Sequence, residues 1–217
     1  MYKTIFLKEV KSFVKHISFY IYGLILFFFV FLYAQNTDPN STVFNLRHGK
    51  EYNLAAVKIA KMFTNWTIAG IFLIMVIVGR AIVKDFQYHI HDFFFTSRIK
   101  KFHYLGGRFL GSYINSLLPF LFIPLAFILG NLTLSPELQS PIYWQSFIYP
   151  FLLIVIPNVL IISSFIFSIS TISRQTIYAY MSSIILIILY LMLIVGTNHM
   201  KNTDLRIMID PFGLNAI

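Results

Sequence analysis

Long apolar runs alternate with short polar stretches along this chain, and the runs determine the architecture that we expect. Each of five runs is long enough to cross a hydrocarbon layer as a helix, for which about 20 apolar residues are needed. They cover residues 17–34, 63–83, 109–130, 147–170 and 177–197. Apolar residues are continuous in these runs rather than alternating, which favours helices over the strands of a β-barrel. We therefore predict an all-α polytopic membrane helix bundle with five spans.

Residues 1–16 follow another pattern, in which apolar and basic positions recur at helical spacing. One side gathers Ile5, Phe6, Glu9, Val10, Phe13 and Val14, and the other holds most of Lys3, Lys8, Lys11 and Lys15. This pattern is typical of a basic amphipathic helix on the membrane surface. A polar lead-in to the first span accounts for the periodicity equally well.

Composition and charge extend this picture. Of the 217 residues, 58% are hydrophobic and only 12% are charged, whereas soluble domains carry about a quarter charged residues. Cysteine is absent, which excludes disulfides, thiolate catalysis and cysteine-ligated metal. The formal net charge is +9. With five predicted spans, more Lys and Arg residues lie on the side of the membrane that holds the N-terminus than on the opposite side. The positive-inside rule then places the N-terminus in the cytoplasm, and we expect a multi-pass protein of a bacterial inner membrane.

Two motifs that would indicate nucleotide binding or zinc catalysis are missing from the sequence. No G-x-x-x-x-G-K-[ST] loop is present, so we expect no P-loop for ATP, and the zinc-protease pattern H-E-x-x-H is also absent. The run GGRFLG at 106–111 precedes a predicted span instead of joining a strand to a helix. Its small residues predict a face for close helix packing rather than a phosphate loop. That face comprises Gly107, Gly111, Ser112 and Ser116.

The predicted spans carry few polar residues. Their central parts hold no Asp, Glu or Lys, which argues against a proton relay. The main irregularities are Asn115, Pro119, Pro124, Pro150, Pro157 and Asn158. Kinks beside a substrate path and ordinary membrane-helix prolines both fit these positions.

Residues 85–101 connect the second and third predicted spans and mix aromatic, acidic and basic side chains. On a helix, one face gathers Phe86, Ile90, Phe93 and Phe94, and the opposite face gathers Asp85, His89, Asp92 and Thr96. We expect a short helix in the membrane interface, followed by a basic stretch. His89 and His91 lie about 200° apart on such a helix, so they cannot bind one metal ion together. Anionic lipid explains the basic stretch without a nucleic-acid partner.

The order of these features resembles the membrane-spanning subunit of ABC-2 type transporters. The resemblance rests on "MYKTIFLKEVKSFVK" at the N-terminus, "GRAIVKDF" at the end of the second span, and "TSRIKKFHYLGGRFLG" leading into the third. Ser97-Arg98 stands where that family often has a proline-containing step. The ending "DPFGLNAI" is similar to a subset of long bacterial permeases, some of which continue into further spans and an aminopeptidase-like domain.

The resemblance implies a single transmembrane domain over residues 1–217, part of a six-span unit that works as a dimer with a second permease copy or half. A sixth span, absent here, would follow. Residues 85–101 would be the coupling segment, which docks on a separate ATP-binding subunit that holds ATP and Mg²⁺, so no cofactor is expected in this chain. The interface with that partner and with lipid would comprise Asp85, Phe86, His89, Ile90, Asp92, Phe93, Phe94, Arg98, Lys100 and Lys101.

Two other functions fit the sequence. One is an integral membrane enzyme acting on lipid, for which His89, His91, Asp92 and His103 are the candidate polar group. The other is a membrane anchor or scaffold for a downstream peptidase-like domain. We expect a transport component rather than an enzyme, in which charge reversal at Asp85 or Asp92 uncouples ATP hydrolysis from transport.

Overall fold

The described part of the chain is almost entirely helical and contains no strand. The computed structural model describes residues 2–35, 56–87, 101–133, 142–198, 205 and 208–213. Four helices are long and apolar enough to cross a membrane, namely Ile17–Gln35, Phe102–Leu132, Trp144–Ser173 and Thr176–Thr197. A bent helix pair would make a fifth span if it is counted as one. The prediction of an all-helical chain compatible with a membrane is thus confirmed for these residues, and the number and sidedness of the spans stay predictions.

Helix α1 (Tyr2–Lys15) is separated from α2 (Ile17–Gln35) by His16. The Nδ1 atom of His16 accepts a hydrogen bond from the backbone N–H of Ser18, 3.3 Å away. The imidazole therefore caps the start of α2, where backbone donors have no partner within the helix. Along α1 the four lysines are exposed while the apolar side is half-buried, as amphipathic spacing requires.

The second predicted span corresponds to two helices, α3 (Ala56–Ala69) and α4 (Ile71–Gln87). They meet at Gly70 with a bend of 49°. Backbone hydrogen bonds continue through the bend, because the Gly70 N–H still donates to the Trp66 carbonyl at 2.8 Å. A Cβ atom at residue 70 would lie 2.5 Å from Cζ of Phe120. Glycine is therefore required for the Phe120 ring to pack inside the bend.

Two further long helices change their hydrogen-bonding pattern beside prolines. Helix α6 (Lys101–Leu117) passes through a 3₁₀ turn, Leu118–Leu121, into α7 (Phe122–Leu132). Helix α8 (Trp144–Pro150) passes through a π segment, Phe151–Val155, into α9 (Ile156–Ser173). Pro119 lies in the first of these irregular stretches and Pro150 directly before the second. Proline has no N–H for the regular ladder, which accounts for a local change of helix type.

A tight turn joins α9 to α10 (Thr176–Asn198). Arg174 ends α9 in the left-handed conformation, with φ of 56°. Near the other end of α10, residues 208–213 fold back onto the helices. The Phe212 ring packs edge-on against Tyr190, with centroids 4.6 Å apart. Asn158 of α9 donates a hydrogen bond to the Phe212 carbonyl at 3.2 Å.

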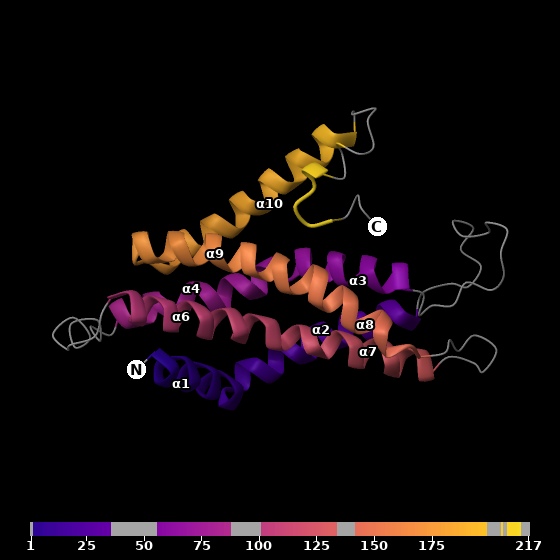
Figure 1. Cartoon of the computed structure of the whole chain (residues 1–217), viewed down its shortest axis with the longest axis horizontal. Helices are drawn as coiled ribbons and strands as arrows, with labels where there is room; N and C mark the ends of the chain where they lie inside the picture. The colour runs from indigo at the N-terminus through magenta and orange to yellow at the C-terminus, as the bar shows by residue number, and fades with distance from the viewer. Residues whose placement is uncertain are drawn as a thin grey trace.

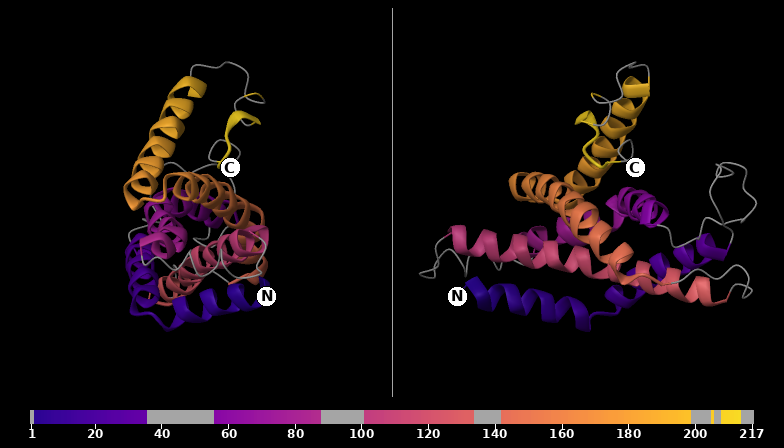
Figure 2. Two further views of the ribbon diagram at one scale, coloured as in Figure 1. Left: turned by 90° about the vertical axis from the view of Figure 1, so that its left-hand side faces the viewer. Right: turned by 45° about the vertical axis from the view of Figure 1, so that its right-hand side comes forward.

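The long helices run roughly along one direction, and α10 diverges from the others (Figures 1 and 2). At one end of the bundle α1 lies beside the start of α6, α4 ends, and α9 turns into α10; we call this the α1 end (Figure 1). The core between the helices is apolar, with Phe63, Ile74, Phe120 and Ile162 fully buried. Many apolar side chains on the outer faces of α2, α9 and α10 are exposed, as expected for surfaces that contact lipid.

Candidate functional site

Arg108 of α6 joins two carboxylates from two other helices at the α1 end. Its Nη1 atom donates to Oε2 of Glu9 in α1, and its Nη2 atom donates to Oδ1 of Asp85 in α4 at 2.5 Å. The Tyr104 hydroxyl donates to the other oxygen of Asp85. The Asp85 side chain is only 2% exposed, and those of Arg108 and Glu9 are 16% and 22% exposed. We call Glu9, Asp85, Tyr104 and Arg108 the charge cluster.

Local structure explains how these four residues meet. Tyr104 and Arg108 are four positions apart on α6 and therefore share one helix face. Gly111, one turn further along, allows α1 to approach closely, because a Cβ atom there would lie 2.8 Å from Cβ of Glu9. Asn115, the next residue on that face, donates to the Glu9 carbonyl at 3.4 Å. Gly111 thus allows α1 to lie close enough to α6 for Glu9 to bind Arg108.

Arg108 supplies the one cation of the charge cluster, against two carboxylates. Arginine presents several N–H donors in a planar fork, so one guanidinium can serve two carboxylates. Removing one member of a buried ion pair leaves an uncompensated charge in a medium of low dielectric constant, which typically costs about 3–5 kcal/mol. We infer that the cluster holds α1, α4 and α6 in one fixed arrangement.

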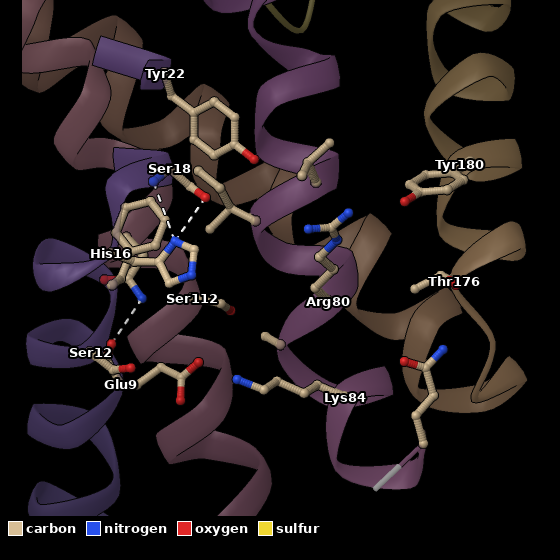
Figure 3. A pocket seen from close by; sticks show the side chains of 16 residues that line it. Glu9, Ser12, His16, Ser18, Tyr22, Arg80, Lys84, Ser112, Thr176 and Tyr180 are labelled. Atoms are coloured by element: carbon tan, nitrogen blue, oxygen red, sulfur yellow. Dashed lines mark hydrogen bonds between the residues drawn. The ribbon is translucent and has the colours of Figure 1, made fainter. Parts of the chain in front are cut away.

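A polar pocket of about 520 Å³ lies next to the charge cluster. Its walls come from α1, α2, α4, α6 and α10 (Figure 3). In Figure 3 Lys84 points across the pocket toward Glu9, and Arg80 lies between Tyr22 and Tyr180. The polar residues of the lining are Glu9, Ser12, His16, Ser18, Tyr22, Arg80, Lys84, Gln87, Ser112, Asn115, Thr176 and Tyr180.

The structure describes three residues of the predicted coupling interface. Asp85 is buried in the charge cluster, so its carboxylate is not on an exposed face as the sequence pattern suggested. Phe86 continues the backbone of α4 to its end at Gln87, and Lys101 begins α6. The other predicted residues, His89, Ile90, Asp92, Phe93, Phe94, Arg98 and Lys100, lie outside the described residues.

The predicted packing residues on α6 contact different neighbours. Gly107 is buried, and Gly111 lies against α1. Ser112 is buried and returns its hydroxyl to the Phe109 carbonyl of its own helix. Ser116 lies 3.4 Å, oxygen to oxygen, from Ser163 of α9. The set therefore serves two interfaces, α6 with α1 and α6 with α9, rather than one continuous seam.

Sequence reasoning missed Tyr104, Arg108 and Glu9 as a group. Glu9 is the one acidic residue in the basic stretch 1–16, and that contrast was the available signal. The side chain of Asn158, one of the irregular positions in the predicted spans, binds the turn at Phe212. No group of three or more His, Asp or Glu side chains that could hold a metal ion occurs among the residues that the structure describes. His103 is described and exposed, and His89, His91 and Asp92 are not among those residues.

Comparison with known proteins gives no relative, because no protein-family model, no curated protein and no solved structure matches this chain. The function is therefore inferred from the residues of the site and from the order of features in the sequence.

Proposed function

We propose that this chain is the membrane-spanning permease component of an ATP-driven ABC-2 type exporter. In this proposal residues 85–101 receive the movement of a separate ATP-binding subunit. One observation carries the proposal: Arg108 links the two flanks of this segment to each other and to α1. Asp85 opens the segment, Arg108 follows it in α6, and Glu9 belongs to the amphipathic helix. A displacement of residues 85–101 would therefore move α1, α4 and α6 together.

Close packing beyond the charge cluster would transmit a movement of the α1 end along the bundle. Gly79 of α4 lies so close to α10 that a Cβ atom there would be 2.8 Å from Cβ of Ala179. On the other side, α6 contacts α9 through Phe109 and Phe167, whose ring centroids are 5.1 Å apart. Packed interiors are too dense to absorb such a displacement. Movement at the α1 end would reach α9 and α10.

In this proposal the ATP chemistry takes place in the partner. Hydrolysis would occur there with ATP and Mg²⁺, because the sequence of this chain has no P-loop. A second permease copy or half would complete the substrate path. The described chain contributes apolar spans and a mechanical link between them.

Site-specific crosslinking of the full chain in the membranes of its host tests this proposal. A photoreactive residue replaces His89 or Asp92, the adducts are purified, and their peptides are identified by mass spectrometry. We expect an ATP-binding protein with a G-x-x-x-x-G-K-[ST] loop among the adducts. The control position is Phe28 of α2, an exposed apolar residue, where lipid adducts are expected. If neither His89 nor Asp92 yields such a protein while the chain is inserted, the proposal is wrong.

Charge reversal of an aspartate gives a second test, for which Asp92 is better suited than Asp85. Asp85→Arg would place a cation against half-buried Arg108, so any loss of partner binding would be mixed with misfolding. Asp92 is not one of the four residues of the charge cluster, so Asp92→Arg leaves those four side chains unchanged. We expect this variant to insert normally and to lose co-purification of the ATP-binding subunit. Retention of the partner by Asp92→Arg would contradict the assigned role of that residue.

A further inference from the structure

The polar pocket at the α1 end has a regular construction that mechanical coupling does not explain. Three helices contribute polar pairs with the i, i+4 spacing that places both members on one face. These pairs are Ser18 and Tyr22 on α2, Arg80 and Lys84 on α4, and Thr176 and Tyr180 on α10. Helix α1 contributes Ser12, next to which His16 lines the pocket from the junction of α1 and α2, and α6 contributes Ser112 and Asn115. Polar faces from five helices thus meet in one cavity.

The fixed charges in this pocket are unbalanced. Arg80 and Lys84 form no hydrogen bond or ion pair with any residue of the described chain, and both are exposed. Glu9 supplies the acidic group of the lining, and its carboxylate is already bound by Arg108. Two cations therefore face the cavity without a paired anion among the described residues.

Hydroxyl groups complete the binding chemistry. Those of Ser12, Tyr22, Thr176 and Tyr180 make no hydrogen bond with another described residue, and each can donate one. An arginine, a lysine and hydroxyl donors together are the groups that bind phosphate oxygens, arginine through two N–H donors and lysine as a compact charge. A cavity of about 520 Å³ is within the range of small-molecule sites and has room for more than a phosphate ion.

The depth of the pocket matches a membrane surface. Lys84 lies one turn and Arg80 two turns before the end of α4 at Gln87. The adjoining wall is α1, whose lysines are exposed and whose apolar side is half-buried. Amphipathic helices of this kind lie at the boundary of headgroups and acyl chains. A ligand in the pocket would lie at the same level.

We propose that the polar pocket binds a phosphate-bearing group at this membrane surface, with Arg80 and Lys84 as its cationic ligands. A phospholipid headgroup and a soluble phosphate ester share this chemistry. The site does not depend on coupling to an ATP-binding subunit.

Binding is measured on the full chain purified in a neutral detergent. One arm adds mixed micelles with phosphatidylglycerol, or with phosphatidylcholine as the matched zwitterionic lipid, and measures the lipid retained after repurification. The other arm titrates sn-glycerol 3-phosphate, with glycerol as the uncharged control, and follows thermal unfolding. We expect saturable retention of phosphatidylglycerol above phosphatidylcholine, or stabilisation by glycerol phosphate but not by glycerol. The responding arm identifies the source of the phosphate.

Variants separate the pocket from general attraction to anionic lipid. Arg80→Gln with Lys84→Gln is expected to weaken binding about tenfold or more, because two charge-assisted contacts are lost. Lys8→Gln with Lys11→Gln removes the same charge from the exposed side of α1 and should leave binding unchanged. Equal weakening in both pairs overturns the proposal. If the pocket variant does not fold, the measurements on the wild-type chain still decide. The absence of a response to both phosphatidylglycerol and glycerol phosphate would also overturn the proposal.

Discussion

At the residue scale, Arg108 has a task that lysine could not perform. It binds Glu9 and Asp85 through different nitrogen atoms, and only a guanidinium holds two such donors in a rigid plane. The Arg108 Nε atom is buried without a hydrogen-bond partner among the described residues. Its two terminal nitrogens therefore carry the interaction with the carboxylates.

Replacement of Arg108 by methionine should strongly destabilise the protein. The variant leaves the Glu9 and Asp85 carboxylates without their cation, and we expect the free energy of unfolding to fall by about 3 kcal/mol or more. Unfolding of the detergent-solubilised chain, followed by circular dichroism, measures this change. Lys8→Met is the matched control, because Lys8 is exposed on α1 and exposed charges contribute little. Equal stability of the two variants would contradict the role given to the charge cluster.

Asp210 is the second residue with a specific task. Its Oδ1 atom accepts the N–H groups of Phe212 and Gly213 at 3.0 and 3.1 Å, and the Tyr190 hydroxyl lies 3.3 Å from it. Asp210→Ala leaves these buried donors unsatisfied and should cost about 1–3 kcal/mol. We expect faster hydrogen exchange at the two amides. Asp210→Asn keeps one side-chain oxygen and should preserve most of the protection, so identical exchange in both variants would refute this explanation.

At the element scale, several close contacts between helices depend on glycine. Gly23 and Gly130 bring α2 and α7 together, since a Cβ atom would lie 2.6 Å from the Phe122 ring at Gly23 and 2.6 Å from Cβ of Ala34 at Gly130. Gly111 does the same for α6 and α1. Small residues permit such approach in membrane bundles, where packing contacts rather than hydrophobic burial hold helices together.

Gly111→Ala should therefore separate α1 from α6. The added methyl group would meet the β and γ carbons of Glu9 at 2.8 and 2.9 Å, and overpacking of this kind costs about 1–3 kcal/mol. Thermal unfolding and limited proteolysis of α1 measure the effect. Gly196→Ala is the matched control, because nothing lies within 4 Å of a Cβ atom there. If both variants unfold alike, close contact at Gly111 does not hold α1.

Hydropathy predicted the uninterrupted helices better than the interrupted ones. The first predicted span, 17–34, agrees with α2 to within one residue, and 177–197 lies within α10. The apolar run 63–83 predicts one span, whereas the structure has two helices that meet at a bend at Gly70. The run does not indicate this bend, because the bend depends on the Phe120 ring from a distant part of the chain. The helix that contains the predicted third span begins at Lys101, eight residues before the apolar run at 109. Its polar first turns lower the apolar signal, although they fold as helix around the charge cluster.

The site was less accessible to prediction than the fold. Helical periodicity separates the exposed lysines of α1 from its half-buried apolar side, but it says nothing of contacts between helices. Glu9 and Arg108 meet only because of how α1 lies on α6. The predicted roles of His89, Asp92 and their neighbours stay predictions, since those residues lie outside the described chain.

At the scale of the whole molecule, the described charges are distributed unevenly between the two ends. Most described Lys and Arg residues lie on elements that meet at the α1 end, namely Lys3, Lys8, Lys11 and Lys15 of α1, Arg80 and Lys84 of α4, Arg108 of α6 and Arg174 after α9. Lys58 and Lys61 lie instead near the start of α3, at the other end (Figure 1). The positive-inside rule predicts that this end faces the cytoplasm. Thr133 after α7 and Tyr143 before α8 would then face the opposite side (Figure 1).

Single cysteines can test this orientation directly, because these 217 residues include none. A membrane-impermeant maleimide is expected to label Thr133→Cys and Tyr143→Cys in intact cells. Lys11→Cys and Gln175→Cys should react only after the cells are permeabilised. All four positions are exposed, so differences report sidedness rather than burial. Labelling of Lys11→Cys in intact cells would reverse the assigned orientation.

The bond between Glu9 and Arg108 also has a consequence for biosynthesis. The two residues are 99 positions apart in the chain, and ribosomes add roughly 5–20 residues per second. Glu9 is therefore translated about 5–20 s before its partner. During that interval the carboxylate has no guanidinium to bind, and the close approach at Gly111 cannot yet form. The N-terminal helix, although made first, can reach its final position only after α6 has entered the membrane.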